Sequence, residues 1–306
     1  MERAAGGSVA GGRWRSVTSD VFSWARDFVE REGRVLERRL FATLFEGADP
    51  AGVVAALLGY GNVDGGFGHG LEPDKLCPDS QPLDVEIAFE VMAEAGAVDR
   101  EVVEQACDFL VSVSDDGGAV PIVLPSVARY PRAAHWAGDN DFPPSLNPTA
   151  GLAAHLHQFG VAHPWRDGAD AYCFATLEAE VPASAHSLSE ALAFLEHAPD
   201  RARAEVLVAP VRDALDSAEW FRWDADDPGY GLTPVHLAPT PDSRWASLFD
   251  EALVDAHLAR LLRDQQPDGG WSIAWEPPSA AAVLAWRVRE TIRALTTLRA
   301  YRRIAG

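Results

Sequence analysis

The sequence predicts an all-α protein built from about six repeated helical hairpins. Three observations support this prediction: apolar residues recur at helical spacing, the alternation typical of strands is scarce, and an Asp-Gly turn recurs along the chain. The chain has 306 residues, of which 47% are hydrophobic, so it can bury a sizeable core.

The turn sequence "NVDGGFG" at Asp64 recurs as "SDDGGAV" at Asp116 and as "QPDGGWSI" at Asp268. Weaker copies are "WRDGAD" at Asp167 and "DDPGYG" at Asp227. Successive copies are 52, 51, 60 and 41 residues apart, an average of 51, which fits six units into the chain. Because glycine after aspartate permits the left-handed turn that joins two helices, we expect a structural role for Asp64, Asp116 and Asp268.

Each unit is expected to contain two helices, with clear apolar stripes over residues 84–97, 101–113, 252–262 and 284–298. A helical hairpin of this size cannot bury its apolar face alone, so the units must stack. Six units favour closure into a ring of inner helices surrounded by outer ones, and an open solenoid is the alternative. We expect a flexible tail over residues 1–12 and a single domain over residues 13–306.

The stretch "LARLLRDQQPDGGW", residues 258–271, resembles the QW repeat of squalene–hopene cyclases, oxidosqualene cyclases and prenyltransferase β subunits. The residues that carry the motif are Gln265 or Gln266, Asp268, Gly269, Gly270 and Trp271. "VVAALLGYGNVDGGFG" is a degenerate copy with Phe67 in the tryptophan position. The resemblance covers most of residues 13–306 and implies a terpenoid cyclase-like (α/α)6 toroid. It says little about the reaction, because one fold hosts many functions.

Charge and composition exclude several classes of function. The net charge of −20 repels nucleic acid and anionic membranes. The sequence shows no signal-peptide core and no apolar run near the roughly 20 residues that span a bilayer. The three cysteines lack CxxC spacing, which favours reduced thiols over disulfides or a zinc knuckle. We therefore expect a cytoplasmic protein that neither binds nucleic acid nor spans a membrane.

We expect no cofactor and no metal. The chain has no P-loop and no DDxxD motif, and its single lysine is Lys75, so an ordinary prenyl diphosphate enzyme is disfavoured. Prenyltransferase β subunits bind zinc through Asp, Cys and His, and Cys77 and Asp79 lie near His69, but the family's ligand spacing is not matched. Acidic loops favour a small-molecule substrate that is cationic or amine-bearing, or that becomes cationic as it reacts.

The opening half of the chain contains one segment that no other repeat copies, "HGLEPD" at residues 69–74. The geometry of the Asp-Gly turn does not require these six residues. We predict that His69 and Glu72 or Asp74 face the cavity as a catalytic proton-transfer pair. The alternative is that these side chains fix the loop to its own backbone.

A second catalytic candidate comes from "DADD" at residues 224–227. It is similar to the DxDD motif of class II terpene cyclases, whose middle aspartate donates a proton. The resemblance implies Asp226 as the acid. A chance match is the alternative, because Asp227 precedes Pro228 and falls on the turn position of the repeat.

Candidates for substrate binding lie on loops, which converge on the central cavity at one end of a toroid. They are Asp79, His135, Trp136, Asp139, Asn147, Asp242, Trp275 and Glu276. The alternative for Asp139 and Asp242 is that each caps the helix that follows it, and the tryptophans could serve packing.

Three functions remain open. The leading one is a cyclase-like enzyme of specialised metabolism that uses acid–base residues in a central acidic and aromatic cavity. The second is an enzyme that forms an N-heterocycle, in which a carboxylate or His69 deprotonates an amine so that it displaces a leaving group. The third is a non-catalytic partner subunit, and a homo- or heterodimer is left open. An aromatic, hydrophobic cavity would favour the first function and a polar, acidic one the second.

Overall fold

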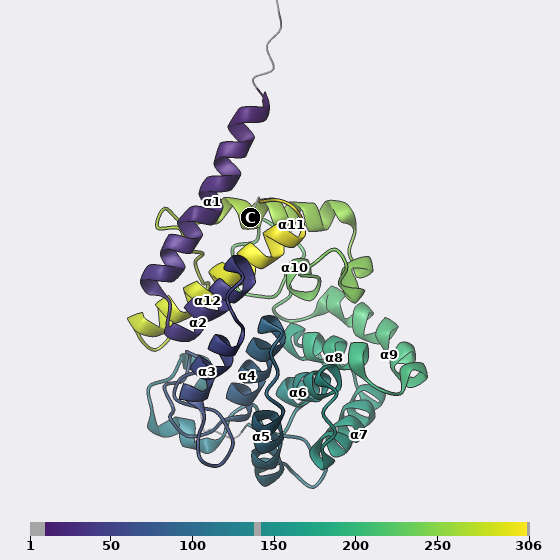
Figure 1. Cartoon of the computed structure of the whole chain (residues 1–306). Helices are drawn as coiled ribbons and strands as arrows, with labels where there is room; N and C mark the ends of the chain where they lie inside the picture. The colour runs from purple at the N-terminus through teal and green to yellow at the C-terminus, as the bar shows by residue number, and fades with distance from the viewer. Residues whose placement is uncertain (1–9, 138–141, 305–306) are drawn as a thin grey trace, which may run out of the picture.

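The computed structural model describes residues 10–137 and 142–304, and over these residues it is helical (Figure 1). Within this range it has twelve α-helices, and β pairing is limited to isolated bridges. The all-α prediction is confirmed. None of the helices in the described part is long and apolar enough to cross a membrane.

The first six α-helices are α1 (Ala10–Glu32), α2 (Val35–Glu46), α3 (Ala51–Leu57), α4 (Pro82–Ala95), α5 (Arg100–Val113) and α6 (Leu146–Phe159). The remaining six are α7 (Pro164–Ala179), α8 (Ala185–His197), α9 (Arg201–Ala214), α10 (Pro234–Leu237), α11 (Glu251–Arg263) and α12 (Ala280–Ala300). Helix α1 begins at Ala10 and so includes the last residues of the predicted tail.

Helix α4 illustrates how the sequence sets the helix bounds. Pro82 occupies the first helical position, where its missing N–H costs nothing, and Gly96 ends the helix in a left-handed conformation with φ of 66°. The predicted apolar stripe is buried, including Phe89 and Met92. This helix contacts α2, α3, α5 and α6, and most of its residues are buried.

The helices pack in two sets. Helices α2, α4, α6 and α8 contact one another in that order, and α12 contacts α2. Helices α1, α3, α5, α7 and α9 pack outside them; for example, α1 lies along α12 and α2 (Figure 1). The main hydrophobic core takes residues from both sets.

The turns after α3, α5 and α11 share one backbone geometry. In the first, the Asn62 N–H donates to the Gly66 oxygen and the Gly65 N–H donates to the Asn62 oxygen, and residues 115–119 and 266–270 repeat this pattern. Gly65, Gly118 and Gly269 have φ of 86°, 85° and 97°. A Cβ on these glycines would collide with the backbone of α5, α7 and α1, respectively, so each turn is seated on an outer helix.

Two of the predicted turn positions differ in the structure. In the second copy Asp115, not Asp116, accepts hydrogen bonds from the N–H groups of Gly117 and Ala119, because the turn is shifted by one residue. Asp167 is wrong as a turn residue: Pro164 starts α7 there, and Asp167 lies within its first turn. Asp227 does form a turn, with Oδ1 accepting from the Gly229 N–H at 2.7 Å.

The 266–270 turn joins the end of the chain to its beginning. The Gln265 side chain donates to the backbone oxygens of Val21 in α1 and of Gly269, both at 2.9 Å, so it connects the turn to α1. Arg31 of α1 donates to the Asp268 backbone oxygen, and Arg287 of α12 pairs with the Asp268 carboxylate at 2.8 Å. We call this contact region the seam.

Replacing Gly269 by Val should destabilise the protein more than replacing Gly96 by Val. Both glycines are left-handed, which costs a β-branched residue about 1–2 kcal/mol or more. Gly96 has no heavy atom within 4 Å of its added Cβ, whereas Gly269 faces the Trp24 backbone. Thermal unfolding of both variants should show the larger loss of Tm for Gly269→Val. Equal losses would mean that the turn is not held against α1.

Candidate functional site

A cavity of about 820 Å³ lies at the N-terminal ends of α4, α6, α8 and α10 and beside the first half of α12. Its volume suits a small molecule. Its aromatic wall consists of Trp136, Trp220, Tyr230, Trp271, Trp275 and Trp286. Its ionisable wall consists of Glu72, Asp74, Asp264, Glu290, Arg222, Arg260, Arg293, His135, His186, His236 and His257. The cavity surface is therefore mainly apolar and aromatic, with ionisable side chains set into it.

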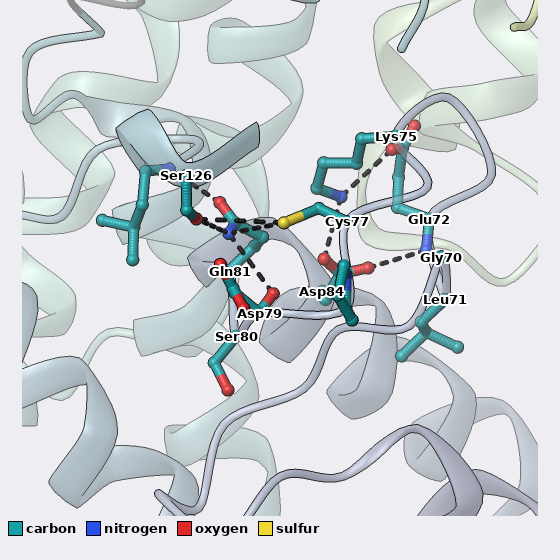
Figure 2. Close-up of polar contacts among 12 residues, drawn as sticks. Gly70, Leu71, Glu72, Lys75, Cys77, Asp79, Ser80, Gln81, Asp84 and Ser126 are labelled. Carbon is teal, nitrogen blue, oxygen red and sulfur yellow. Dashed lines mark hydrogen bonds and ion pairs between the residues drawn. The ribbon is translucent and has the colours of Figure 1, made fainter. Parts of the chain in front are cut away.

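The loop that carries Glu72 and Asp74 is anchored by a buried ion cluster (Figure 2). The Lys75 ammonium lies 3.1 Å from Glu72 Oε2 and 3.0 Å from Asp84 Oδ2, and all three side chains are buried. Asp84, in the first turn of α4, also accepts the Glu72 backbone N–H at 2.7 Å. Burial opposes the charge on Lys75, but Asp84 and Glu72 outweigh it and raise its pKa.

Other contacts fix the same loop on both sides. Arg34 donates to the backbone oxygens of Gly70 and Leu71 at 2.8 and 3.1 Å. The Ala133 N–H donates to the Asp74 backbone oxygen at 2.7 Å, which ties the loop to the segment that carries His135. The position of Asp74 is thus set by backbone contacts and by the ion cluster, not by its own carboxylate.

The Asp74 carboxylate faces the cavity and has two polar neighbours there. The Trp286 indole N–H donates to Oδ1 at 2.8 Å, and His135 Nε2 lies 3.4 Å from Oδ2. Burial, followed by the charge of Glu72, raises the pKa of Asp74 to about 7, against the opposing effects of the Trp286 N–H, Trp275 and Lys75. Burial lowers the pKa of His135. With a pKa near neutrality, Asp74 can therefore exchange a proton beside the cavity.

Three aromatic rings stand around this pair. Trp275 packs edge-on against Trp286, with ring centres 5.2 Å apart, and edge-on against Tyr230 at 5.5 Å. Burial and the nearby Asp74 charge raise the pKa of Tyr230 to about 12, and its hydroxyl oxygen lies 2.8 Å from His186 Nε2. Trp275 lowers the pKa of Asp74, although its Nε1 is buried without a hydrogen-bond partner in the described range. Rings in this arrangement beside a carboxylate can hold a cation.

Six of the residues predicted for the site line the cavity: Glu72, Asp74, His135, Trp136, Asn147 and Trp275. Five are not part of its lining: His69, Asp79, Asp226, Asp242 and Glu276. Asp139 lies outside the described residues.

His69 does not pair with Glu72 or Asp74 in the structure. It is exposed, and its Nε2 lies 2.9 Å from Asn62 Oδ1. The glycine before it, Gly68, does not make room for an imidazole; a Cβ there would collide with the backbone oxygens of residues 78 and 79. His135 takes the place beside Asp74 that the sequence assigned to His69.

The remaining outlying candidates lie at the surface. Asp226 has a side chain that is 78% exposed and pairs with Arg263 at 2.9 Å. Asp79 pairs with Arg129 at 2.6 Å, and both side chains are exposed. Asp242 and Glu276 are also exposed.

Several cavity residues were missed because they come from helices and loops that the sequence does not mark as functional. One signal was available on α12, where Trp286, Glu290 and Arg293 recur at helical spacing within a mostly apolar helix. Trp220 gave no signal, yet it has φ of 61° and is half exposed at the cavity. A strained aromatic residue beside a cavity is a frequent mark of a ligand contact.

The described residues contain no group of three or more His, Cys, Asp or Glu side chains arranged to hold a metal ion. No family model and no curated protein matches the sequence. The fold is similar to a solved structure of a protein from Actinoplanes, with a TM-score of 0.57 and 16% sequence identity. That similarity covers 94% of this chain and 99% of the other. At this identity it concerns the fold alone.

Replacing Lys75 by Met should destabilise the protein by about 3 kcal/mol or more, because Glu72 and Asp84 would remain buried without their cation. Replacing Arg129 by Met is the matched control. It removes an exposed ion pair and should cost less than about 1 kcal/mol. Urea unfolding of both variants measures the difference, and similar losses would show that the cluster is not an anchor.

The Asp74 carboxyl should titrate near pH 7, and ¹³C NMR of labelled aspartate can measure this, with Asp74→Asn identifying the signal. The pKa of Asp74 is higher in the folded state than in the unfolded state, so its protonation stabilises the fold. This stabilisation is fully present below the unfolded-state pKa of about 4. This stabilisation is lost as the pH rises through about 7. The Tm of wild type relative to that of Asp74→Asn should therefore fall as the pH rises from 4 through 7. A carboxyl signal that titrates near pH 4 would contradict the assignment.

Proposed function

We propose that the twelve helices form a closed (α/α)6 toroid of the QW-repeat, terpenoid cyclase-like type. The consecutive contacts of α2, α4, α6 and α8 and the contact of α12 with α2 support this proposal. The seam supports it further, because the last turn is seated on α1 in the same way as earlier turns are seated on α5 and α7. Trp271 contributes as the motif implies, donating from Nε1 to the Leu261 oxygen at 2.8 Å.

Within this fold we propose a cyclase that closes a nitrogen-containing ring on a polar small molecule. The observation that carries the proposal is Asp74, a buried cavity carboxylate with a pKa of about 7, beside His135 and the Trp275–Trp286 pair. The ionisable lining favours a polar substrate, because a hydrocarbon would have to desolvate these groups without pairing them.

The proposed step uses Asp74 as a general base. The aromatic rings hold an ammonium group of the substrate by cation–π attraction, with Glu72 contributing negative charge. Asp74 takes a proton from the nitrogen, whose electron pair then forms the new N–C bond. The bond from that carbon to its leaving group breaks, and the leaving group departs with the bonding electrons. His135 can receive the proton from Asp74 and pass it to solvent, because its ring is half exposed.

Acid-initiated cyclisation of an alkene is the second candidate, and the aromatic wall favours it. There the protonated form of Asp74 would donate its proton to a carbon–carbon double bond, and the rings would stabilise the resulting carbocation. The two candidates predict opposite pH profiles. Activity should rise through about pH 7 for the base mechanism and fall through it for the acid mechanism.

Asp74→Asn should lower turnover by about 10²-fold or more, whereas His69→Ala should leave it unchanged. The measurement compares metabolites from strains carrying the wild-type, Asp74→Asn and His69→Ala genes by untargeted mass spectrometry. Ring closure by displacement converts an accumulated precursor into a product lighter by the leaving group and one proton. Alkene cyclisation leaves the mass unchanged. Identical metabolites in all three strains, together with copurification of a second chain, would instead indicate a non-catalytic partner subunit.

A further inference from the structure

One wall of the cavity has an unbalanced positive charge. Arg260 pairs with Asp264 at 2.6 Å, and Arg293 pairs with Glu290 at 2.5 Å. Arg222 has no carboxylate partner in the described part of the chain; its Nη1 donates to the Asp227 backbone oxygen at 2.8 Å. Burial lowers the pKa of Arg222, and the charges of Arg260 and Arg293 lower it further, against the opposing carboxylates Asp227 and Asp264.

Two N–H groups of the residues in this wall lack acceptors. Arg222 Nε and Arg293 Nη1 are buried, and neither has a hydrogen-bond partner within residues 10–137 and 142–304. His236 adds a third donor. Its Nδ1 accepts the Thr233 N–H at 3.0 Å, so the proton of the neutral ring is on Nε2. Burial, with the charges of Arg293 and Arg222, lowers the pKa of His236 well below its usual value and keeps the ring neutral.

We propose that this wall, formed by Arg222, Arg293 and His236, binds an oxyanion group of the substrate: a carboxylate, a phosphate or a sulfate. An unpaired guanidinium beside a cavity and N–H donors without acceptors both raise the free energy of the folded protein. A bound oxyanion lowers it by forming charge-assisted hydrogen bonds with these groups. The inference rests on the proposed function in one respect, namely that the cavity holds the substrate.

The position of this wall relative to Asp74 indicates the shape of the substrate. Trp286, which donates to Asp74, and Arg293 are both on α12, seven residues apart, which is about 10 Å along the helix. The Asp74 partner Trp286 and the anion-binding Arg293 are therefore carried by turns of α12 that lie about two turns apart. This placement favours an extended substrate with two charged ends.

The test is isothermal titration calorimetry at pH 7.5 and constant ionic strength, with inorganic sulfate, inorganic phosphate and acetate as separate probes. Wild type should bind at least one probe with a Kd below about 10 mM. Arg222→Gln should weaken that binding by about tenfold or more. Arg263→Gln is the control, because Arg263 is 63% exposed and pairs with Asp226 on the surface, and it should bind like wild type.

Binding of sulfate or phosphate without acetate would identify a tetrahedral oxyanion, and binding of acetate alone would identify a carboxylate. No binding of any probe by wild type at 50 mM (about fivefold above the expected Kd), or equal binding by Arg222→Gln, would overturn the inference. Arg293→Gln, titrated in the same way, replaces Arg222→Gln if circular dichroism shows that the latter is unfolded. Asp74→Asn should keep the anion affinity of wild type, so failure of the proposed reaction and failure of this inference can be told apart.

Discussion

The buried ion cluster of Lys75 with Glu72 and Asp84 is the constraint on which the candidate site depends. It holds the only lysine of the chain between a loop carboxylate and the first turn of α4. Because Asp74 precedes Lys75, the cluster also sets where the Asp74 carboxylate lies. The segment around residue 133 is hydrogen bonded to this loop, so His135 reaches Asp74 only while the loop stays in place.

The two ends of the cavity differ in how their charges are compensated. Around Asp74, desolvation raises the pKa of the carboxyl group to about 7. The carboxyl can therefore exchange protons near neutrality. At the Arg222 wall the charge cannot be removed in this way, because a guanidinium stays protonated at any physiological pH. The first end suits proton transfer, whereas the second suits binding.

The sequence predicted the helical class and the Asp-Gly turns because both follow from local rules, namely apolar period and the need for glycine at positive φ. It also predicted, from a segment that no repeat requires, that Glu72 and Asp74 face the cavity. It could not predict that His135 replaces His69, because that depends on a backbone contact between loops about 60 residues apart. The "DADD" segment misled for a similar reason: only the fold shows that Asp226 lies on the surface beside Arg263.

The seam has a consequence for how the chain reaches its native state. Its hydrogen bonds connect residues more than 230 positions apart, such as Arg31 with Asp268 and Gln265 with Val21. During synthesis α1 therefore emerges long before its partner turn exists, and its contact face stays uncovered until nearly the whole chain is made. Contacts of such high sequence separation are slow to form, because loop-closure entropy must be overcome first. Completion of the fold is thus coupled to completion of translation, and a chain that stops before residue 266 cannot form the seam.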